Sequence, residues 1–166
     1  MKPGNFKVNY ENEQLSATIA VRPSLSLKIA LYFLNILLIS VIILFTIGGI
    51  GVIVLFIVAF EVLFLRYAIW NIYGAETIKL TRDALSYQQH YGFLKLPVKS
   101  FHLNHPIRII PFHENFQAGN QAMKLIFESL DESNEPVNLY QTALVISRSD
   151  YALLMQSLQQ LQAKAS

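Results

Sequence analysis

One long stretch of the chain is almost entirely apolar. Between residues 29 and 65 the only charged side chain is Glu61, and the other clearly polar ones are Asn35, Ser40 and Thr46. A single helix of this length would extend about 55 Å, whereas the hydrocarbon core of a bilayer is about 30 Å thick. The stretch is therefore too long for one upright crossing.

Glycines divide the apolar stretch near its middle. Gly48, Gly49 and Gly51 tolerate the positive φ angles and close approach that a reversal of chain direction requires. We therefore predict a transmembrane helical hairpin over residues 27–72, with helices at about 27–47 and 50–71. One long, tilted helix with the termini on opposite sides is the alternative topology.

Basic residues flank the predicted hairpin, while its glycine turn has no charge. Those before it are Lys2, Lys7, Arg22 and Lys28, and those after it are Arg66, Lys79 and Arg82. Under the positive-inside tendency, both termini are expected in the cytoplasm and the chain in the cell (inner) membrane as a multi-pass protein. Tyr67, Trp70 and Tyr73 suit the headgroup level, where aromatic rings are enriched.

Glu61 is the one acidic residue inside the predicted membrane segment. If the chain reverses near Gly48 and Gly49, Glu61 is level with Asn35 and lies about 7–8 Å deeper than Arg66, within reach of a snorkelling guanidinium. We predict an intramembrane polar contact among Glu61, Asn35 and Arg66 that stabilises the hairpin or an oligomer. A proton or ion relay is the functional alternative.

The segment after the hairpin has the alternating pattern of half-buried antiparallel strands. Thr77 and Lys79, for example, alternate with Ile78 and Leu80. Strands are predicted at residues 76–80, 84–91, 93–100, 101–110, 123–128 and 137–140. Tyr91-Gly92 predicts a tight hairpin turn, and Pro97, Pro106 and Pro111 restrict their strands to edges or ends.

A strand and a helix complete the predicted water-facing part. In the N-terminal segment, residues 1–26, we predict a cytoplasmic strand at 15–21 that is free to pair with the sheet after the hairpin. The domain at 73–166 is predicted to end in a helix at about 149–163. Ser149 is its expected N-cap, Asp150 lies in its first turn, and one apolar stripe faces the core: Tyr151, Leu154, Leu158 and Leu161.

This arrangement resembles bacterial membrane proteins that carry a pleckstrin-homology-like (PH-like) domain, most of unassigned function. The resemblance rests on the aromatic-rich residues 66–76, which lead into a Gly-x-Glu strand, on the strand pair divided at Tyr91-Gly92, and on the terminal helix at 147–161. It implies an α+β membrane protein in which a PH-like antiparallel β-barrel or sandwich is capped by a C-terminal helix. Phosphoinositide-binding relatives use a basic cluster between the first two strands, and Lys79 and Arg82 match it thinly.

Charge is unevenly distributed although only 14% of residues are charged and the net charge is +2. Residues 66–112 are basic and residues 113–166 acidic, so anionic lipid headgroups are an expected partner of the first half. The predicted membrane-surface contacts are Arg66, Trp70, Lys79, Arg82, Lys95 and Lys99. Topology and solubility alone would explain the same charges. Nucleic acid is not expected, because the basic residues are dispersed.

No catalytic motif is recognisable. The absence of cysteine excludes disulfides, thiol catalysis and cysteine-ligated metals. His102, His105 and His113 lie close in sequence, but their spacing suits surface or partly buried histidines better than a metal site. We expect no enzyme activity, no cofactor and no metal.

The sequence therefore favours a non-catalytic, membrane-anchored PH-like interaction module that binds a partner protein or lipid headgroups. An accessory subunit of a transporter or membrane enzyme, in which Glu61 and Asn35 pack against another subunit, is the second hypothesis. A homo-oligomer would meet the same packing requirement. A lipid-modifying or proton-coupled enzyme that uses Glu61 with Tyr32 or Arg66 is the third.

Overall fold

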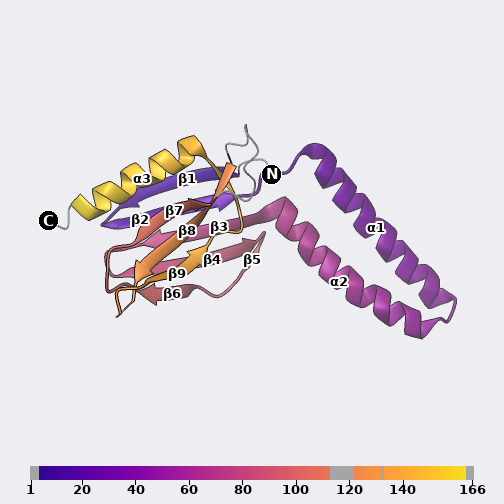
Figure 1. The fold of residues 1–166 in the computed structure, drawn as a ribbon. Helices are drawn as coiled ribbons and strands as arrows, with labels where there is room; N and C mark the ends of the chain where they lie inside the picture. The colour runs from indigo at the N-terminus through magenta and orange to yellow at the C-terminus, as the bar shows by residue number, and fades with distance from the viewer. Residues whose placement is uncertain (1–3, 113–121, 132, 164–166) are drawn as a thin grey trace.

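Two long apolar helices, two antiparallel sheets and a C-terminal helix form the structure, a computed structural model that describes residues 4–112, 122–131 and 133–163 (Figure 1). The helices are α1 (Leu25–Ile47), α2 (Gly51–Tyr73) and α3 (Arg148–Ala163). The strands are β1 (Asn5–Glu11), β2 (Gln14–Ala20), β3 (Gly74–Leu80), β4 (Ala84–Tyr91), β5 (Leu94–Lys95), β6 (Lys99–His102), β7 (Arg108–Phe112), β8 (Ala122–Leu130), β9 (Pro136–Gln141) and β10 (Ile146–Ser147).

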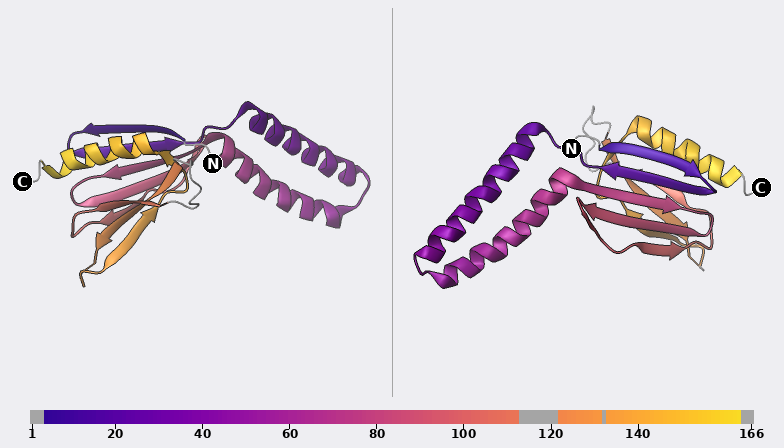
Figure 2. Two further views of the ribbon diagram at one scale, coloured as in Figure 1. Left: turned by 45° about the horizontal axis from the view of Figure 1, so that its top comes forward. Right: turned by 180° about the vertical axis from the view of Figure 1, so that it is seen from behind.

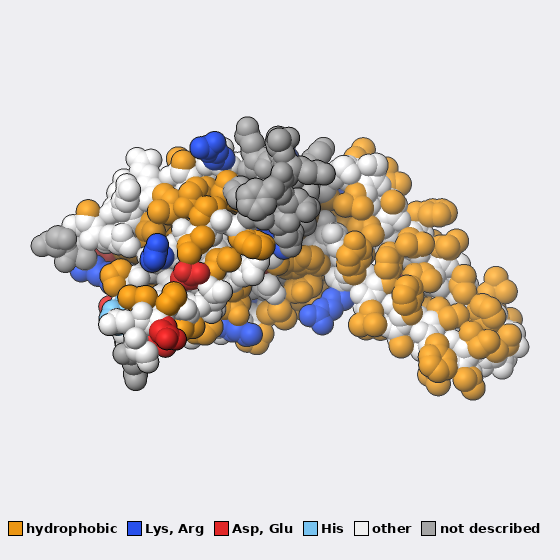
Figure 3. All heavy atoms as spheres, in the orientation of Figure 1, with side chains coloured by type: hydrophobic (Ala, Val, Ile, Leu, Met, Phe, Trp, Pro, Cys, Tyr) orange, Lys and Arg blue, Asp and Glu red, His pale blue; other side chains and the backbone are white. Residues whose placement is uncertain are grey.

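The apolar stretch folds back on itself as two antiparallel helices. α1 begins after Ser24, whose hydroxyl accepts a hydrogen bond from the Leu27 amide, and the chain reverses at Gly49, where φ is +71°. Both helices are long and apolar enough to cross a membrane. Only 6% of the apolar segment of α1 and 11% of that of α2 are buried, so neither resembles the core helix of a soluble fold. Figure 3 shows their hydrophobic side chains on the outside.

The helical hairpin is inserted between two neighbouring strands of one sheet. β2 leads into α1, α2 leads into β3, and β2 and β3 pair antiparallel, with Ala20 opposite Ala75. The Val21 amide also donates to the Gly74 carbonyl over 2.8 Å. The predicted pairing of the N-terminal strand with the later sheet is thus observed. Both helices consequently project from one end of the β domain (Figure 2).

The β domain is a sandwich of two sheets. One has the order β1-β2-β3-β4, with β5 and β6 both on β4, and in the other β8 pairs with β7 on one side and with β9 and β10 on the other. Their facing side chains make one core with the apolar stripe of α3, which includes Leu154, Leu158 and Leu161. Neither sheet closes on itself among the described residues, so of the predicted barrel or sandwich the barrel is not confirmed.

β1 is an additional strand that the sequence analysis omits. Its half-buried Phe6, Val8 and Tyr10 alternate with exposed residues. It joins β2 through Asn12 and Glu13, which both have positive φ, the geometry of a type I′ turn.

The middle strands differ from their predicted boundaries because prolines interrupt them. The run 93–100 becomes β5 and β6, with Pro97 between them, and only the end of the run 101–110 enters β7, beyond Pro106. Pro111 lies in β7, at the edge of its sheet, as expected for a residue without an amide hydrogen. The turn after β4 is Gly92-Phe93, one residue later than predicted.

The N-cap of α3 is Ser147 rather than Ser149. The Ser147 hydroxyl accepts from the Asp150 amide, and the Asp150 carboxylate accepts from the Ser147 amide and hydroxyl. This reciprocal arrangement is a capping box, which satisfies otherwise unpaired groups at the helix start.

Candidate functional site at the junction of helices and sheet

The passage from α2 into β3 is direct and depends on Gly74. Its amide donates to the Trp70 carbonyl, and a Cβ atom at this position would overlap both that carbonyl oxygen and the Trp70 indole. Glycine therefore allows the last helical turn to abut the sheet without an intervening loop. This abutment fixes the helix end relative to β4, the neighbour of β3.

Aromatic side chains from three elements gather at this junction. The Trp70 and Tyr91 ring centroids lie 4.8 Å apart, and the Arg66 guanidinium carbon lies 5.5 Å from the Tyr91 centroid. The Tyr32 and Tyr73 hydroxyls are hydrogen-bonded at 2.6 Å, linking α1 to α2. Helical side chains tilt toward the N-terminus, so residues on antiparallel helices tilt in opposite directions and these two meet although their backbones differ in depth.

Of the residues predicted to contact a membrane surface, Arg66, Trp70 and Lys95 lie at this junction. Lys95 is opposite His90, next to the last pair of the β4–β5 ladder. Tyr91, which holds Arg66 and Trp70 together, was considered only as a turn residue in the sequence. A turn assignment says nothing about which face a ring occupies, so the sequence contained no clear sign of this contact.

The other predicted surface contacts lie farther from the helices. Lys99 is opposite Tyr87, part-way along β4, with its ammonium nitrogen 5.9 Å from the Tyr87 ring centroid. Lys79 and Arg82 lie toward the opposite end of the domain, about 17 Å or more from Gly74 at roughly 3.3 Å per residue. Arg82 forms an ion pair with Glu13 at 3.3 Å. The six residues therefore do not form one surface.

Glu61 and Asn35 are both buried between α1 and α2, with 8% and 9% of their surface exposed. Their predicted hydrogen bond is not formed: the Asn35 amide donates to the Leu31 carbonyl at 2.6 Å, while Asn35 Oδ1 and Glu61 Oε2 have no hydrogen-bond partner in the described part of the chain. The opposite tilt of side chains on antiparallel helices accounts for this, because Asn35 is directed toward the β domain and Glu61 away from it. The same tilt directs Glu61 away from Arg66.

Glu76 is a second buried carboxylate, and the sequence analysis does not name it as a candidate site residue. It is fully buried on β3, and its oxygens accept hydrogen bonds from the Ala143 amide at 2.9 Å and the Leu144 amide at 3.4 Å. Burial raises the pKa of Glu76, and these amides offset part of the increase. The pKa of the neighbouring Tyr140 is raised by burial and by the Glu76 charge.

The position of Glu76 had a sequence signal. It belongs to the same alternation as Ile78 and Leu80, and the strand burial confirms that all three face inward. An acid on the apolar face of a strand indicates a paired carboxylate in the core. Here it holds the β9–β10 loop against the first sheet, a structural role.

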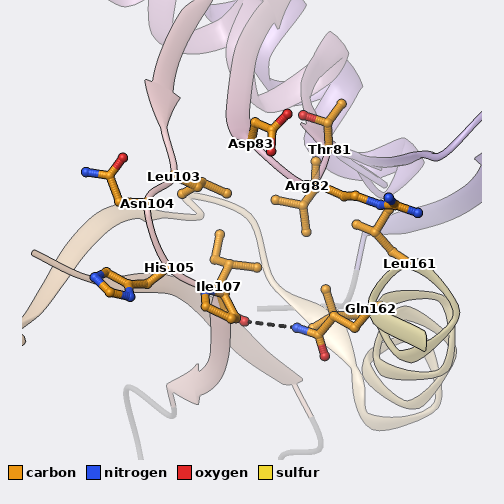
Figure 4. Close-up of a pocket in the computed structure, with 12 residues that line it drawn as sticks. Thr81, Arg82, Asp83, Leu103, Asn104, His105, Ile107, Leu161 and Gln162 are labelled. Atoms are coloured by element: carbon orange, nitrogen blue, oxygen red, sulfur yellow. Dashed lines mark hydrogen bonds between the residues drawn. The ribbon is translucent and has the colours of Figure 1, made fainter. Parts of the chain in front are cut away.

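A cavity of about 440 Å³ opens at the end of the domain remote from the helices (Figure 4). Its lining combines apolar side chains, among them Leu103, Ile107 and Leu161, with the polar groups of Arg82 and Asn104 at its rim. The Gln162 amide donates to the Ile107 carbonyl at 3.5 Å across it. Apolar walls with a few polar groups suit an inserted side chain or small amphipathic group.

Among the described residues, no three metal-ligating side chains lie together. His102 is on β6 and His105 in the following loop, and His113 lies outside the described residues.

No protein-family model, no curated protein and no solved structure matches the chain.

Proposed function

We propose that this chain is an integral membrane protein whose α1–α2 hairpin crosses the bilayer twice and anchors a non-catalytic β domain at one surface. The observation that carries the proposal is the insertion of an outwardly apolar hairpin between the paired strands β2 and β3. Because the chain leaves and re-enters the same sheet at adjacent positions, two crossings place the N- and C-terminal parts on one side. Basic residues near both helix ends favour the cytoplasmic side of the inner membrane.

We further propose a PH-like character for the β domain, consistent with its two packed antiparallel sheets and C-terminal helix. The end nearest the helices faces lipid headgroups, whereas the cavity beside Asn104 faces away from the bilayer and meets a partner protein. These two surfaces lie at opposite ends of the strands, so one domain can contact the bilayer and a partner protein at the same time.

Photo-crosslinking in native membranes tests the partner. A crosslinker at Asn104, which is exposed at the rim of the cavity, should give a defined protein adduct. The matched control is a crosslinker at Asn9, an exposed residue on the outer face of β1. A failure of Asn104 to give any adduct beyond those of Asn9 would contradict a partner at the cavity.

A second candidate function, an accessory subunit of a transporter or membrane enzyme, is favoured by the polar pair in the hairpin. Asn35 Oδ1 and Glu61 Oε2 lack hydrogen-bond partners among the residues that the structure describes, and intramembrane polar groups normally pair with one another or line a cavity. Either oxygen would be satisfied by a donor from another subunit's helix.

Substitution of Glu61 separates the two functions. If another subunit binds it, Glu61→Leu and Glu61→Gln should leave the abundance and folding of the protein unchanged but release it from a larger complex on native gels. Ser40→Ala, which removes an exposed hydroxyl from α1, is the matched control and should retain the complex. Unchanged complex size in the Glu61 variants would exclude the subunit function for this residue.

A further inference from the structure

The β4–β5 turn is an apolar protrusion beside the membrane-proximal helix ends. Tyr91, the last residue of β4, pairs with Gly74, the first residue after α2, so Gly92 and Phe93 extend beyond the sheet on the helix side. The Gly92 amide donates to the Tyr73 carbonyl at 3.3 Å. At Gly92, φ is +61°, and a Cβ there would lie 3.4 Å from the Tyr73 Cβ.

The tip of this turn presents its apolar side chains outward. Phe93 is 85% exposed and Leu94 is 54% exposed, and Leu96 and Val98 continue the apolar surface toward β6. A phenylalanine that exposes this much surface to water forgoes the favourable transfer free energy that burial of its ring would give. Transfer of the tip from water into an apolar phase would therefore be favourable.

Three other hairpin turns among the described residues have a different composition. The β1–β2 turn is Asn12-Glu13, the β3–β4 turn contains Arg82 and Asp83, and the β8–β9 turn contains Asp131 and Glu135. These polar turns lie at the end remote from the helices (Figure 1). Among these four described turns, the apolar one lies at the end where the helices leave the domain.

Charge around the tip is basic without an acidic counterpart in the same stretch. Lys95 follows the tip, Arg66 lies on the Tyr91 ring beside it, and the sequence has no acidic residue between Asp83 and Glu114. Cationic side chains beside an inserted apolar group favour the headgroup region of an anionic leaflet over a neutral protein surface.

We propose that the Phe93-Leu94 tip inserts into the headgroup and acyl boundary of the same bilayer that the α1–α2 hairpin crosses. This third contact rests on the proposed membrane anchoring, and lipid is its occupant because the tip is continuous with the end of α2. Insertion fixes the tilt of the β domain about the helix ends and keeps the distal cavity directed away from the bilayer.

Site-specific fluorescence in the full chain tests the insertion. The protein contains no cysteine, so Phe93→Cys, Val137→Cys and Leu55→Cys each provide one site for an environment-sensitive fluorophore in anionic lipid vesicles. All three native side chains are exposed, so the core is unchanged. Val137, on β9 near the acidic turn, is the matched exposed site at the remote end, and Leu55 reports the first two turns of α2, near the reversal of the hairpin.

The label at residue 93 should be shifted to the blue and quenched several-fold more by lipid-attached spin labels than the label at residue 137. A label at Leu94, in Leu94→Cys, should behave like that at 93. Equal, water-like behaviour of residues 93 and 137 with lipid quenching at 55 would overturn the insertion while leaving the anchor intact. Shielding of residue 93 from both lipid and aqueous quenchers would show protein at the tip and also overturn it. A water-like label at 55 would instead refute the anchor.

Discussion

The helical hairpin and the β domain place their apolar side chains on opposite sides. In the hairpin, Phe56 is 74% exposed while Asn35 and Glu61 are buried, whereas in the domain Phe127 is 1% exposed and the lysines face outward. A chain surrounded by water alone would not expose its apolar side chains before Gly74 and bury them after it. The difference supports the proposal that the hairpin lies in lipid and the β domain in water.

Among the described residues, each region buries one carboxylate, and the two differ in their hydrogen bonds. Glu76 in the domain accepts hydrogen bonds from two backbone amides, while Glu61 Oε2 in the hairpin has no partner among the described residues. A satisfied carboxylate completes a core, and an unsatisfied one requires a donor from outside the chain. We therefore assign Glu76 to the stability of the domain, whereas the unpaired oxygen of Glu61 supports the proposed packing against another subunit.

The largest expected effect tests whether apolar side chains are packed inside the β domain but exposed on the hairpin. Phe127→Ala should destabilise the β domain by about 3–5 kcal/mol, because it opens a cavity in a packed core. Denaturant unfolding in detergent micelles, followed by tyrosine fluorescence, measures this loss.

The matched change in the hairpin is Phe56→Ala, at an exposed phenylalanine of α2. Its effect in micelles should remain within about 0.5 kcal/mol, since no internal packing is lost. Similar losses for both variants would mean that the hairpin is packed internally and that the contrast between the regions is false.

A smaller loss is expected at the buried carboxylate of the domain. Glu76→Ala leaves the Ala143 amide and the buried Leu144 amide without their acceptor, which should cost about 2–4 kcal/mol. Thermal unfolding of the purified protein measures it, and a loss near zero would remove Glu76 from the structural account.

The pH dependence of stability sharpens this result. Burial raises the pKa of Glu76 above its ordinary 4.5, so the folded state favours the protonated carboxyl. The stability that this protonation contributes is complete below about pH 4.5 and is lost as the pH rises through the folded-state pKa. Glu76→Gln removes this titration, and its stability relative to the natural protein should increase with pH. A relative stability that decreases as pH rises would show that the folded state lowers the pKa instead.

The smallest effect concerns the bond that joins the two helices near the junction. Tyr32→Phe removes the 2.6 Å contact to Tyr73 and should cost about 0.6 kcal/mol, typical of interhelical hydrogen bonds. Tyr67→Phe, at an exposed tyrosine of α2, is the control and should have no measurable effect. Equal effects of the two changes in micelle unfolding would refute a specific helix-to-helix bond.

Much of the fold follows from local patterns in the sequence. The hairpin is predictable because lipid-facing helices are apolar on every side, and the limits of α2 differ from 50–71 by only a few residues. β1 was missed because its turn is Asn12-Glu13, whereas asparagine followed by glycine is the usual indication of a type I′ turn. Alternation in β1 was present but short and polar.

The candidate site was less predictable because its parts come from distant segments. Arg66 and Trp70 lie on α2, but their partner Tyr91 reaches them only through the register of β3 with β4. Lys79 and Arg82 were predicted to share a membrane surface with Arg66 from their charge alone. They lie toward the opposite end of the domain, because β3 runs away from the helices. Sequence distance from a helix is a poor guide to spatial distance when a strand leads straight away from it.

Accessibility of single cysteines in sealed, oriented vesicles tests the two-crossing hairpin most directly. Asn9→Cys, Gly51→Cys and Gln160→Cys report the N-terminal strand, the helical turn and α3, and a Cβ at Gly51 meets no atom within 4 Å. A membrane-impermeant maleimide should label residues 9 and 160 from one side and residue 51 only from the other. Labelling of residues 9 and 160 from opposite sides, or of all three from the same side, would contradict the account.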